Sequence, residues 1–369
     1  DRSFVHPPEL YERVRGWRFA DFQEHDIGDG WHAMARERLL AKIQDKTRIA
    51  VDLLKSEPWD LFMVVFGESD TVSHHFWLFH DPNSPRHRAG FENAIRDVYE
   101  RLDRTVAQLV GSAGGDVTIG VCSDHGFGGA GTGVVHINNW LAEHGYLTFA
   151  PARESMLKRA ALTLTPQRAR GALFRAFRGL ATRAEGHSRF AGIDFARTRA
   201  WSDELNYFPS VRVNLAGREP LGQVPKSDYD AFCDELCAAL ESWEVVARAR
   251  RREALYDGPY VEHAPDIVIE LAMEDGYSHS CVRRRGGPPF RRLTSDEYPG
   301  GKEHGMTGNH RPTGVLFLSK PTTCGAACLE DIAPTVLSEI GIPGPPMDGT
   351  SLLDHYSEYD GPAARVNAA

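Results

Sequence analysis

The sequence lacks both a long apolar run and a recognisable leader. A membrane-spanning helix needs about 18 or more apolar residues in succession, and the 369 residues contain no such run. The first eight residues, DRSFVHPP, lack the apolar segment of a secretory signal peptide. Because the chain begins with Asp rather than Met, we expect that it was processed or that a further segment precedes it.

Cysteine and glycosylation signals are also scarce. The six cysteines include no pair with the C-x-x-C spacing of a zinc ribbon. No N-x-S/T sequence occurs either. Because free thiols persist in reducing compartments, these absences predict a cytoplasmic protein without structural disulfides.

Positive charge is not in excess, since the formal net charge is −9. This balance argues against general nucleic-acid binding, which depends on basic surfaces. Residues 153–199 are an exception, with 11 basic residues against three acidic ones. We expect a partly helical insertion whose arginine stems cover apolar surface. Contact with an acidic membrane surface or with an anionic substrate is the alternative.

The overall composition, 41% hydrophobic and 25% charged, is that of a globular protein. The length allows a large core or two domains. We expect the first part of an α/β metal-binding core in residues 1–150 and a basic helical and α+β cap in 151–262. A lid loop and a return to the core are expected in 263–369.

Two short apolar segments have the composition of buried strands, namely DLFMVVF at 60–66 and DVTIGVC at 116–122. The apolar spacing of residues 91–110 predicts an amphipathic helix between them. A strand, a helix and a strand in this order form a right-handed unit with parallel strands. The carboxyl ends of both segments are therefore expected at the same edge of a sheet.

Acidic and histidine side chains follow both predicted strands. Asp70 and His74 come after the first, and Asp124 and His125 come directly after the second. Ligands and chemistry collect beyond the carboxyl ends of strands in open α/β sheets. Carboxylates and imidazoles are zinc ligands, so the repetition predicts a metal site.

Two further stretches bear on this site. Residues 126–131, GFGGAG, match the G-x-G-x-x-G dinucleotide pattern, but more glycine and β-branched residues follow where a helix should begin. We therefore expect a loop there. A third candidate ligand, His310, stands in GNHRP before an apolar segment, and His304 is its nearby rival.

Apolar periodicity predicts the remaining elements. Helices are expected at 33–55, 229–243 and 329–340, strands at 211–215, 266–271 and 315–318, and a loop at 70–80.

Taken together and in this order, the motifs resemble those of the alkaline phosphatase superfamily, above all its type I phosphodiesterase and nucleotide pyrophosphatase branch. They are Asp70-x-x-x-His74, SDHG at 123–126, GNH at 308–310, and DIAPT at 331–335 before MDG at 347–349. The resemblance covers most of 55–150 and 200–353. It implies an α/β fold with a large, mostly parallel sheet sandwiched between helices, an inserted cap, and an amino-terminal strand that has no counterpart in the first sixty residues.

The resemblance also implies two divalent metal ions, zinc or alternatively manganese. Asp70, His74 and His310 match the ligands of one ion, and Asp124 and His125 match ligands of the other. The family's Thr or Ser nucleophile and a further aspartate belong to the absent strand, so we expect them upstream. The implied reaction is a two-step displacement, in which a hydroxyl attacks phosphorus and water then hydrolyses the phospho-enzyme.

The implied substrate is a small phosphate ester, and the implied activity is that of a metal-dependent phosphodiesterase. A phosphomonoesterase, a phosphosugar mutase or a non-catalytic anion-binding relative are the alternatives. A sulfatase is disfavoured because the sequence has no C-x-P-x-R or S-x-P-x-R site. Arginines of the predicted lid are candidates for binding substrate oxyanions, with a solvated loop as the alternative. These are Arg283, Arg284, Arg285, Arg291 and Arg292.

Overall fold

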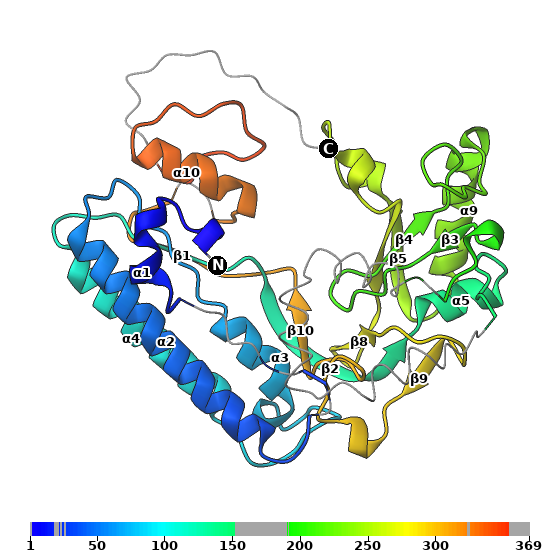
Figure 1. Ribbon diagram of the computed structural model, residues 1–369, viewed down its shortest axis with the longest axis horizontal. Helices are drawn as coiled ribbons and strands as arrows, with labels where there is room; N and C mark the ends of the chain where they lie inside the picture. Colours follow the sequence, from blue (N-terminus) through cyan, green and yellow to red (C-terminus); the bar gives the residue numbers. More distant parts are fainter. Residues whose placement is uncertain are drawn as a thin grey trace.

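The protein has an α/β fold in which helices accompany three separate sheets of two, five and four strands (Figure 1). The computed structural model describes residues 2–17, 22, 24–25, 27–151, 190, 192–322 and 325–353. Nearly all of the basic segment at 153–199, and with it the predicted membrane or substrate contact, lies outside the described residues.

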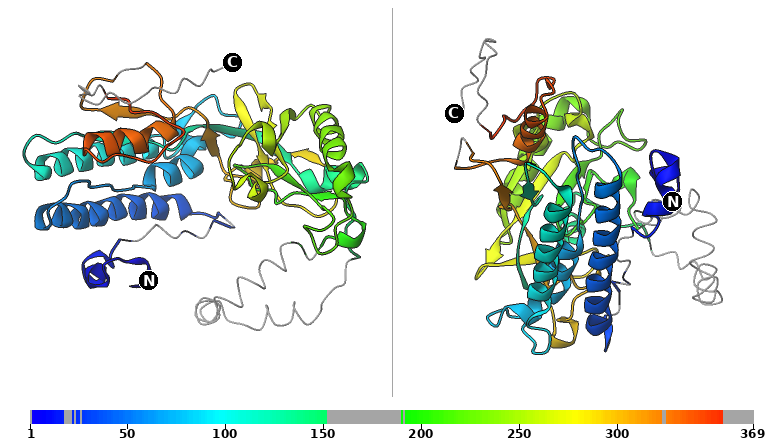
Figure 2. Two further views of the ribbon diagram at one scale, coloured as in Figure 1. Left: turned by 90° about the horizontal axis from the view of Figure 1, so that it is seen from above. Right: turned by 90° about the vertical axis from the view of Figure 1, so that its left-hand side faces the viewer.

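Three helices form an apolar core of their own. α2 (Trp31–Ser56) and α4 (Ala94–Ala113) run side by side, and α3 (Glu68–His80) contacts both (Figures 1 and 2). The apolar residues of α2 recur every three or four positions, so they fall on one face, as the sequence predicts. The core includes Ala35, Leu39, Ile43, Val72, Phe76, Leu78 and Val98, all fully buried.

A buried ion pair joins α2 to the first turn of α3. Lys46 Nζ lies 2.8 Å from Glu68 Oε1, and both side chains are almost completely buried. Breaking such a pair from one side costs about 3–5 kcal/mol, because the remaining charge is left buried. The pair therefore fixes where α3 begins relative to α2.

The five-stranded sheet is built around β2 (Gly126–Val135). β10 (Gly308–Arg311) pairs antiparallel with its first half, where His310 lies opposite Phe127. The second half pairs parallel with β8 (Tyr277–Cys281) and antiparallel with β9 (Phe290–Arg292). β7 (Met273–Glu274) pairs antiparallel with β8.

β10 lies directly against the backbone of α3. Thr307 donates to the His74 carbonyl through both its N–H (2.9 Å) and its hydroxyl (3.0 Å). A Cβ atom added at Gly308 would lie 2.2 Å from the Ser73 carbonyl oxygen. Only glycine permits this approach, and the approach brings the end of β10 to the histidine-bearing face of α3.

The four-stranded sheet has the order β3 (Ala200–Trp201), β4 (Ser210–Val213), β6 (Ile267–Leu271), β5 (Val246–Arg251), and its named pairs are antiparallel. It shares one apolar core with α5 (Ile137–Glu143) and α9 (Tyr229–Glu241). The helix α5 lies before residue 151 and the strand β6 lies after residue 262, so this core joins residues from both sides of the expected cap. The domain boundaries themselves stay a prediction.

Residues 60–66 do not form the strand that the sequence predicts. They are assigned to no strand, exposed and half-buried positions alternate from Leu61 to Phe66, and they form no backbone hydrogen bond with another described segment. The exposed positions are Leu61 (48%), Met63 (77%) and Val65 (58%). An apolar segment without a neighbour cannot be part of a sheet, so the expected parallel unit is not present among the described residues.

The expected large, mostly parallel sheet is likewise not seen in the described part of the chain. β1 (Gly120–Cys122) is shorter than predicted and pairs antiparallel with β11 (Leu316–Leu318) in a sheet of two strands. Among the named strand pairs, only β2 with β8 is parallel. Large apolar side chains stay exposed here too, including Phe317 (66%) and Val121 (38%).

Two local predictions are wrong. Residues 70–80 lie in the helix α3 and not in a loop. Their apolar side chains continue to pack on α2 and α4 beyond Asp70, and the helix ends only at Asp81. The glycine-rich residues 126–131 lie in β2 and not in a loop. Neighbouring side chains occupy the space above these glycines; a Cβ atom added at Gly129, for example, would lie 2.7 Å from the Tyr277 ring.

The remaining elements are short. They are α1 (Tyr11–Val14), α10 (Ile332–Glu339) and the 3-10 turns η1 (Arg2–Phe4), η2 (Pro8–Leu10), η3 (Phe195–Arg197), η4 (Lys226–Asp228), η5 (Arg252–Ala254), η6 (Val261–His263), η7 (Ser295–Glu297) and η8 (Leu329–Asp331). Within the described ranges, no helix combines the length and the apolarity needed to cross a membrane. The cytoplasmic location stays a prediction.

The contact between β10 and α3 gives a test of the fold. We expect Gly308→Ala to lower the free energy of unfolding by about 1–3 kcal/mol, because the new methyl group meets the Ser73 carbonyl. Gly111→Ala is the matched control, since Gly111 lies within α4 and a Cβ atom there meets nothing within 4 Å. Urea unfolding monitored by circular dichroism should show the control unchanged or stabilised by up to about 1 kcal/mol. Equal stability of the two variants would contradict the proposed close approach.

Candidate metal centre

α3 places an acid and a histidine on one face. Asp70 and His74 are four residues apart, so their side chains lie one turn above each other. His74 Nδ1 lies 2.9 Å from the Gly308 carbonyl oxygen. Because a carbonyl only accepts, Nδ1 carries the proton, and in the neutral imidazole Nε2 is left with its lone pair. A backbone partner of this kind orients the ring of a metal-binding histidine.

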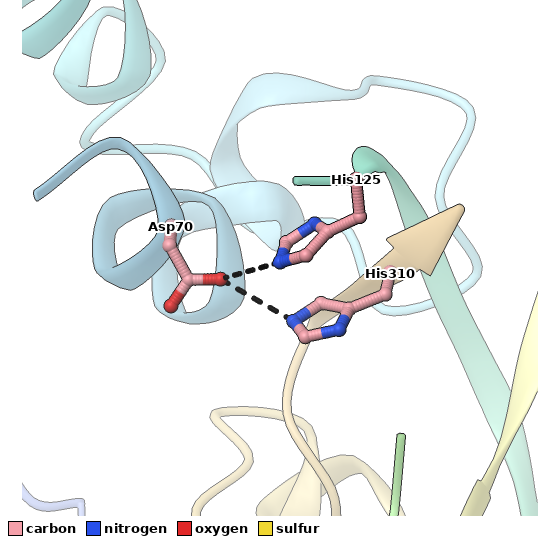
Figure 3. A group of neighbouring side chains, drawn as sticks. All are labelled: Asp70, His125 and His310. Atoms are coloured by element: carbon pink, nitrogen blue, oxygen red, sulfur yellow. Dashed lines mark ion pairs between the residues drawn. The ribbon is translucent and has the colours of Figure 1, made fainter. Parts of the chain in front are cut away.

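Two further histidines approach from β2 and β10 (Figure 3). His310 lies on β10, opposite Phe127, and His125 stands two residues before that partner. The His125 and His310 rings stack with centroids 3.6 Å apart. His125 Nδ1 faces the Gly126 carbonyl at 3.0 Å, so the lone pair of His125 is also on Nε2.

The three imidazoles converge on one carboxylate oxygen. Asp70 Oδ1 lies 3.3 Å from His310 Nε2, 3.4 Å from His74 Nε2 and 3.5 Å from His125 Nε2. This oxygen is buried and has no hydrogen bond of good geometry among the described residues. His74 Nε2 and His310 Nε2 are themselves only 3.1 Å apart.

This donor set fits a divalent cation. One ligand atom each from Asp70, His125 and His310 lies within 4.8 Å of the others, and two imidazoles with one carboxylate are a common zinc set. The close Nε2 atoms and the buried Asp70 Oδ1, which has no hydrogen-bond donor among the described residues, would be stabilised by coordination to a cation.

The surroundings keep Asp70 ionised. Burial acts to raise the pKa of this carboxyl, but the neighbouring His310 and His74 outweigh it and hold the pKa well below its usual range. Asp70 is therefore available as an anionic ligand throughout the neutral range.

Asp124 lies at the rim of the cluster. Its side chain is 83% exposed, and Oδ1 lies 3.6 Å from His125 Nε2. A metal ion held by Asp124 and His125 would lack the four ligands usual for zinc. Further ligands for such an ion would have to come from outside this pair.

The other candidates from the sequence lie apart from the cluster. His304 pairs with Glu297 at 3.3 Å. Glu297 also binds Arg291 (2.7 Å), and Arg292 binds Glu274 (2.6 Å). Both arginines lie on β9 rather than in a lid. Their role in substrate binding stays a prediction. The remaining three, Arg283, Arg284 and Arg285, line a small cavity beside the four-stranded sheet.

Sequence reasoning did not find Tyr207. Its ring stacks on His310 with centroids 5.4 Å apart and an angle of 26° between the planes, although the side chain is 60% exposed. Nothing in the surrounding NYFPS marks this tyrosine, because the contact joins positions more than 100 residues apart in the sequence.

Comparison with known proteins gives one match to a family. The model of the type I phosphodiesterase / nucleotide pyrophosphatase family matches residues 3–310. No curated protein matches.

Two solved structures are similar to the chain. Both are phosphonoacetate hydrolase from Sinorhizobium meliloti 1021, one in complex with phosphonoformate (14% identity) and one with phosphonoacetate (16% identity). Each match has a TM-score of 0.38 and covers 79% of this chain. The chain spans about half the length of these relatives, since the match covers 54% of each of them. Similarity at this level does not identify a substrate.

Zinc titration tests the cluster directly. We expect His310→Ala to weaken Zn²⁺ binding by more than the roughly 10–100-fold that loss of an outer-shell partner causes, because it removes one converging Nε2. Isothermal titration calorimetry of the full chain measures this. His263→Ala is the control, since that side chain is 72% exposed and lies on η6. Equal zinc affinity in both variants would show that the cluster is not the metal site.

Proposed function

The chain belongs to the type I phosphodiesterase / nucleotide pyrophosphatase family of the alkaline phosphatase superfamily, and on this basis we propose that it hydrolyses a small phosphate ester with the help of divalent metal ions. The observation that supports the proposal best is the convergence of three imidazole Nε2 atoms on Asp70 Oδ1 within 3.3–3.5 Å. Three chain segments meet there.

We assign the residues as the family resemblance does, which pairs His125 with Asp124 although His125 Nε2 also lies 3.5 Å from Asp70 Oδ1. Asp70, His74 and His310 would hold one ion, and Asp124 and His125 would contribute to a second. Zinc suits these donors, and manganese is the alternative. Bound divalent ions neutralise the charge of a phosphoryl group and lower the pKa of a bound water or hydroxyl.

Two backbone carbonyls and one aromatic side chain orient this centre. The Gly308 carbonyl fixes the His74 ring, and the Gly126 carbonyl fixes the His125 ring. Tyr207 covers one face of His310 and leaves most of its own ring exposed. An exposed aromatic beside the centre provides a surface on which the apolar part of an ester can pack.

The attacking hydroxyl, a Thr or Ser, is proposed to come from a polypeptide segment outside residues 1–369. The support is the segment 60–66, whose outward positions Leu61, Met63 and Val65 are apolar and exposed. Its inward side is anchored, since Phe66 packs against the three-helix core. A strand added beside 60–66 would cover these side chains and would supply the missing sheet hydrogen bonds.

Ester hydrolysis tests the proposed activity. We expect protein that includes its upstream segment and is loaded with zinc to hydrolyse bis(p-nitrophenyl) phosphate, and chelation by EDTA to abolish the activity. Asp124→Ala should lower kcat/KM by about 100-fold or more, because it removes a ligand of the second ion. Asp103→Ala on α4 is the control.

The same assay separates the alternatives within the superfamily. Faster hydrolysis of p-nitrophenyl phosphate than of the diester would indicate a phosphomonoesterase. If Asp124→Ala and His310→Ala both leave the hydrolysis rate unchanged, the proposed function is wrong.

Hydrogen exchange tests the added strand. We expect the amides of residues 61–66 to exchange rapidly in the chain 1–369 and to become protected when the upstream coding sequence is included, since they then donate to a neighbouring strand. Amides of β2 serve as the internal reference and should not change. Equal protection of 61–66 in both proteins would show that nothing pairs with this segment.

A further inference from the structure

A cavity separate from the metal cluster is lined by charged groups from two distant parts of the sequence. Its volume is about 50 Å³, which is room for more than one water molecule. Its apolar wall comes from aromatic side chains beside the four-stranded sheet. The polar lining consists of Asn138, Ser202, Glu204, Arg283, Arg284 and Arg285.

Glu204 is the unusual member of this lining. It is 6% exposed, and its backbone has φ of +50°, a left-handed conformation that is costly for a residue with a side chain. Oε1 accepts a hydrogen bond from the Asn138 N–H (3.0 Å). Oε2 is buried and has no hydrogen-bond partner among the described residues. Glu204 thus combines a strained backbone with a buried carboxyl oxygen that accepts no hydrogen bond from the described residues.

The loop that carries Glu204 is fixed from both sides. Asn138 binds the backbone of Ser202 twice, through Nδ2 (2.9 Å) and Oδ1 (2.8 Å), and the Ser202 hydroxyl accepts from the Glu204 N–H (3.0 Å). Two residues after Glu204, Asn206 Oδ1 accepts from the Cys281 N–H (3.0 Å). These hydrogen bonds on both sides of Glu204 therefore fix the position of its backbone.

Arginines outnumber acidic residues in the lining of the cavity. Arg283, Arg284 and Arg285 carry three positive charges, against the single carboxyl of Glu204. Arg285 donates to the Ala150 carbonyl, and in the part of the chain that the structure describes it forms no ion pair with a carboxylate. Within the described residues, no carboxylate forms an ion pair with Arg284. The arginines of β9 differ in this respect, since each of them is paired with a glutamate.

We propose that this cavity binds a small oxyanion, the phosphate or carboxylate group of a small molecule, between the guanidinium groups of Arg283, Arg284 and Arg285 and the carboxyl of Glu204. Guanidinium groups recognise both anions through charge-assisted hydrogen bonds. Glu204 in its protonated form donates from its unused oxygen to the anion. Binding here does not depend on the proposed hydrolase activity.

The loop also connects this cavity to the candidate metal centre. Tyr207 follows Glu204 by three residues and stacks on His310. An anion that holds Glu204 and the arginines in place also holds the start of the segment that positions the Tyr207 ring. Occupancy of the cavity therefore stabilises the aromatic surface beside His310.

Burial raises the pKa of Glu204 to about 7. The Asn138 hydrogen bonds, the charge of Arg283 and the backbone N–H of Arg284 act in the opposite direction and lower it. Glu204 thus changes from neutral to anionic between pH 6 and 8. The Cys281 thiol, which interacts with Glu204, stays protonated there, since burial raises its pKa well above the usual value. An anionic Glu204 repels a bound anion, so oxyanion affinity falls as the pH rises through 7.

Sulfate is the probe for the first test, because its charge is constant over this pH range. In isothermal titration calorimetry of the full chain at pH 6 with EDTA present, we expect saturable sulfate binding. Arg284→Gln should weaken it about tenfold or more, while Arg250→Gln, an exposed arginine on β5, keeps wild-type affinity. Acetate in place of sulfate distinguishes a carboxylate ligand from a tetrahedral one. No saturable binding of either anion, or equal affinity in the two variants, overturns the proposal.

The second test uses Glu204→Gln, which keeps the size and removes the titration. Wild-type sulfate affinity should fall between pH 6 and 8, whereas the affinity of Glu204→Gln should stay constant. Thermal melting checks that each variant is folded. A wild-type affinity that does not change with pH, or the same pH dependence in both proteins, overturns the role of Glu204. Loss of ester hydrolysis without any change in sulfate binding would count against the proposed function alone.

Discussion

The contact between β10 and α3 is the constraint on which the candidate centre depends. At Gly308 the strand comes so near the Ser73 carbonyl that no side chain fits. Thr307 binds the His74 carbonyl, and the Gly308 carbonyl binds the His74 ring. One junction therefore sets the distance between helix and strand, the orientation of His74, and the position of His310 two residues further along.

The two ends of this junction are anchored by different kinds of interaction. α3 is held by its apolar face in the three-helix core and by the buried Lys46–Glu68 pair at its first turn. The segment before β10 is held by Arg86, a fully buried guanidinium that donates to the carbonyls of Tyr298, Gly305 and Met306. Burial lowers the pKa of Arg86 to about 10, so the group stays charged at neutral pH. The centre thus lies between two rigid supports.

The arginines of β9 and those of the loop before it have different neighbours. Arg291 and Arg292 are neutralised by Glu297 and Glu274, so they stabilise local structure. The loop arginines line a cavity together with Glu204, whose oxygen lacks a donor. The five arginines between residues 283 and 292 therefore divide into two groups, which differ in the acidic residues that they contact.

The sequence alone determined the types and the order of the chemical groups. The four-residue spacing of Asp70 and His74, the Asp124-His125 pair and His310 indicated a metal site, and the apolar stripes of α2 and α4 were predicted because helix periodicity is local.

The tertiary structure decided which of these groups meet. It brought His125, His74 and His310 to one oxygen of Asp70 and left Asp124 at the rim. It also left 60–66 unpaired and made a strand of the glycine-rich 126–131, because strand pairing depends on neighbours that are distant in sequence. Glu204 and Tyr207 gave no signal in the sequence for the same reason, since their partners lie about 80 and 100 residues further along the chain.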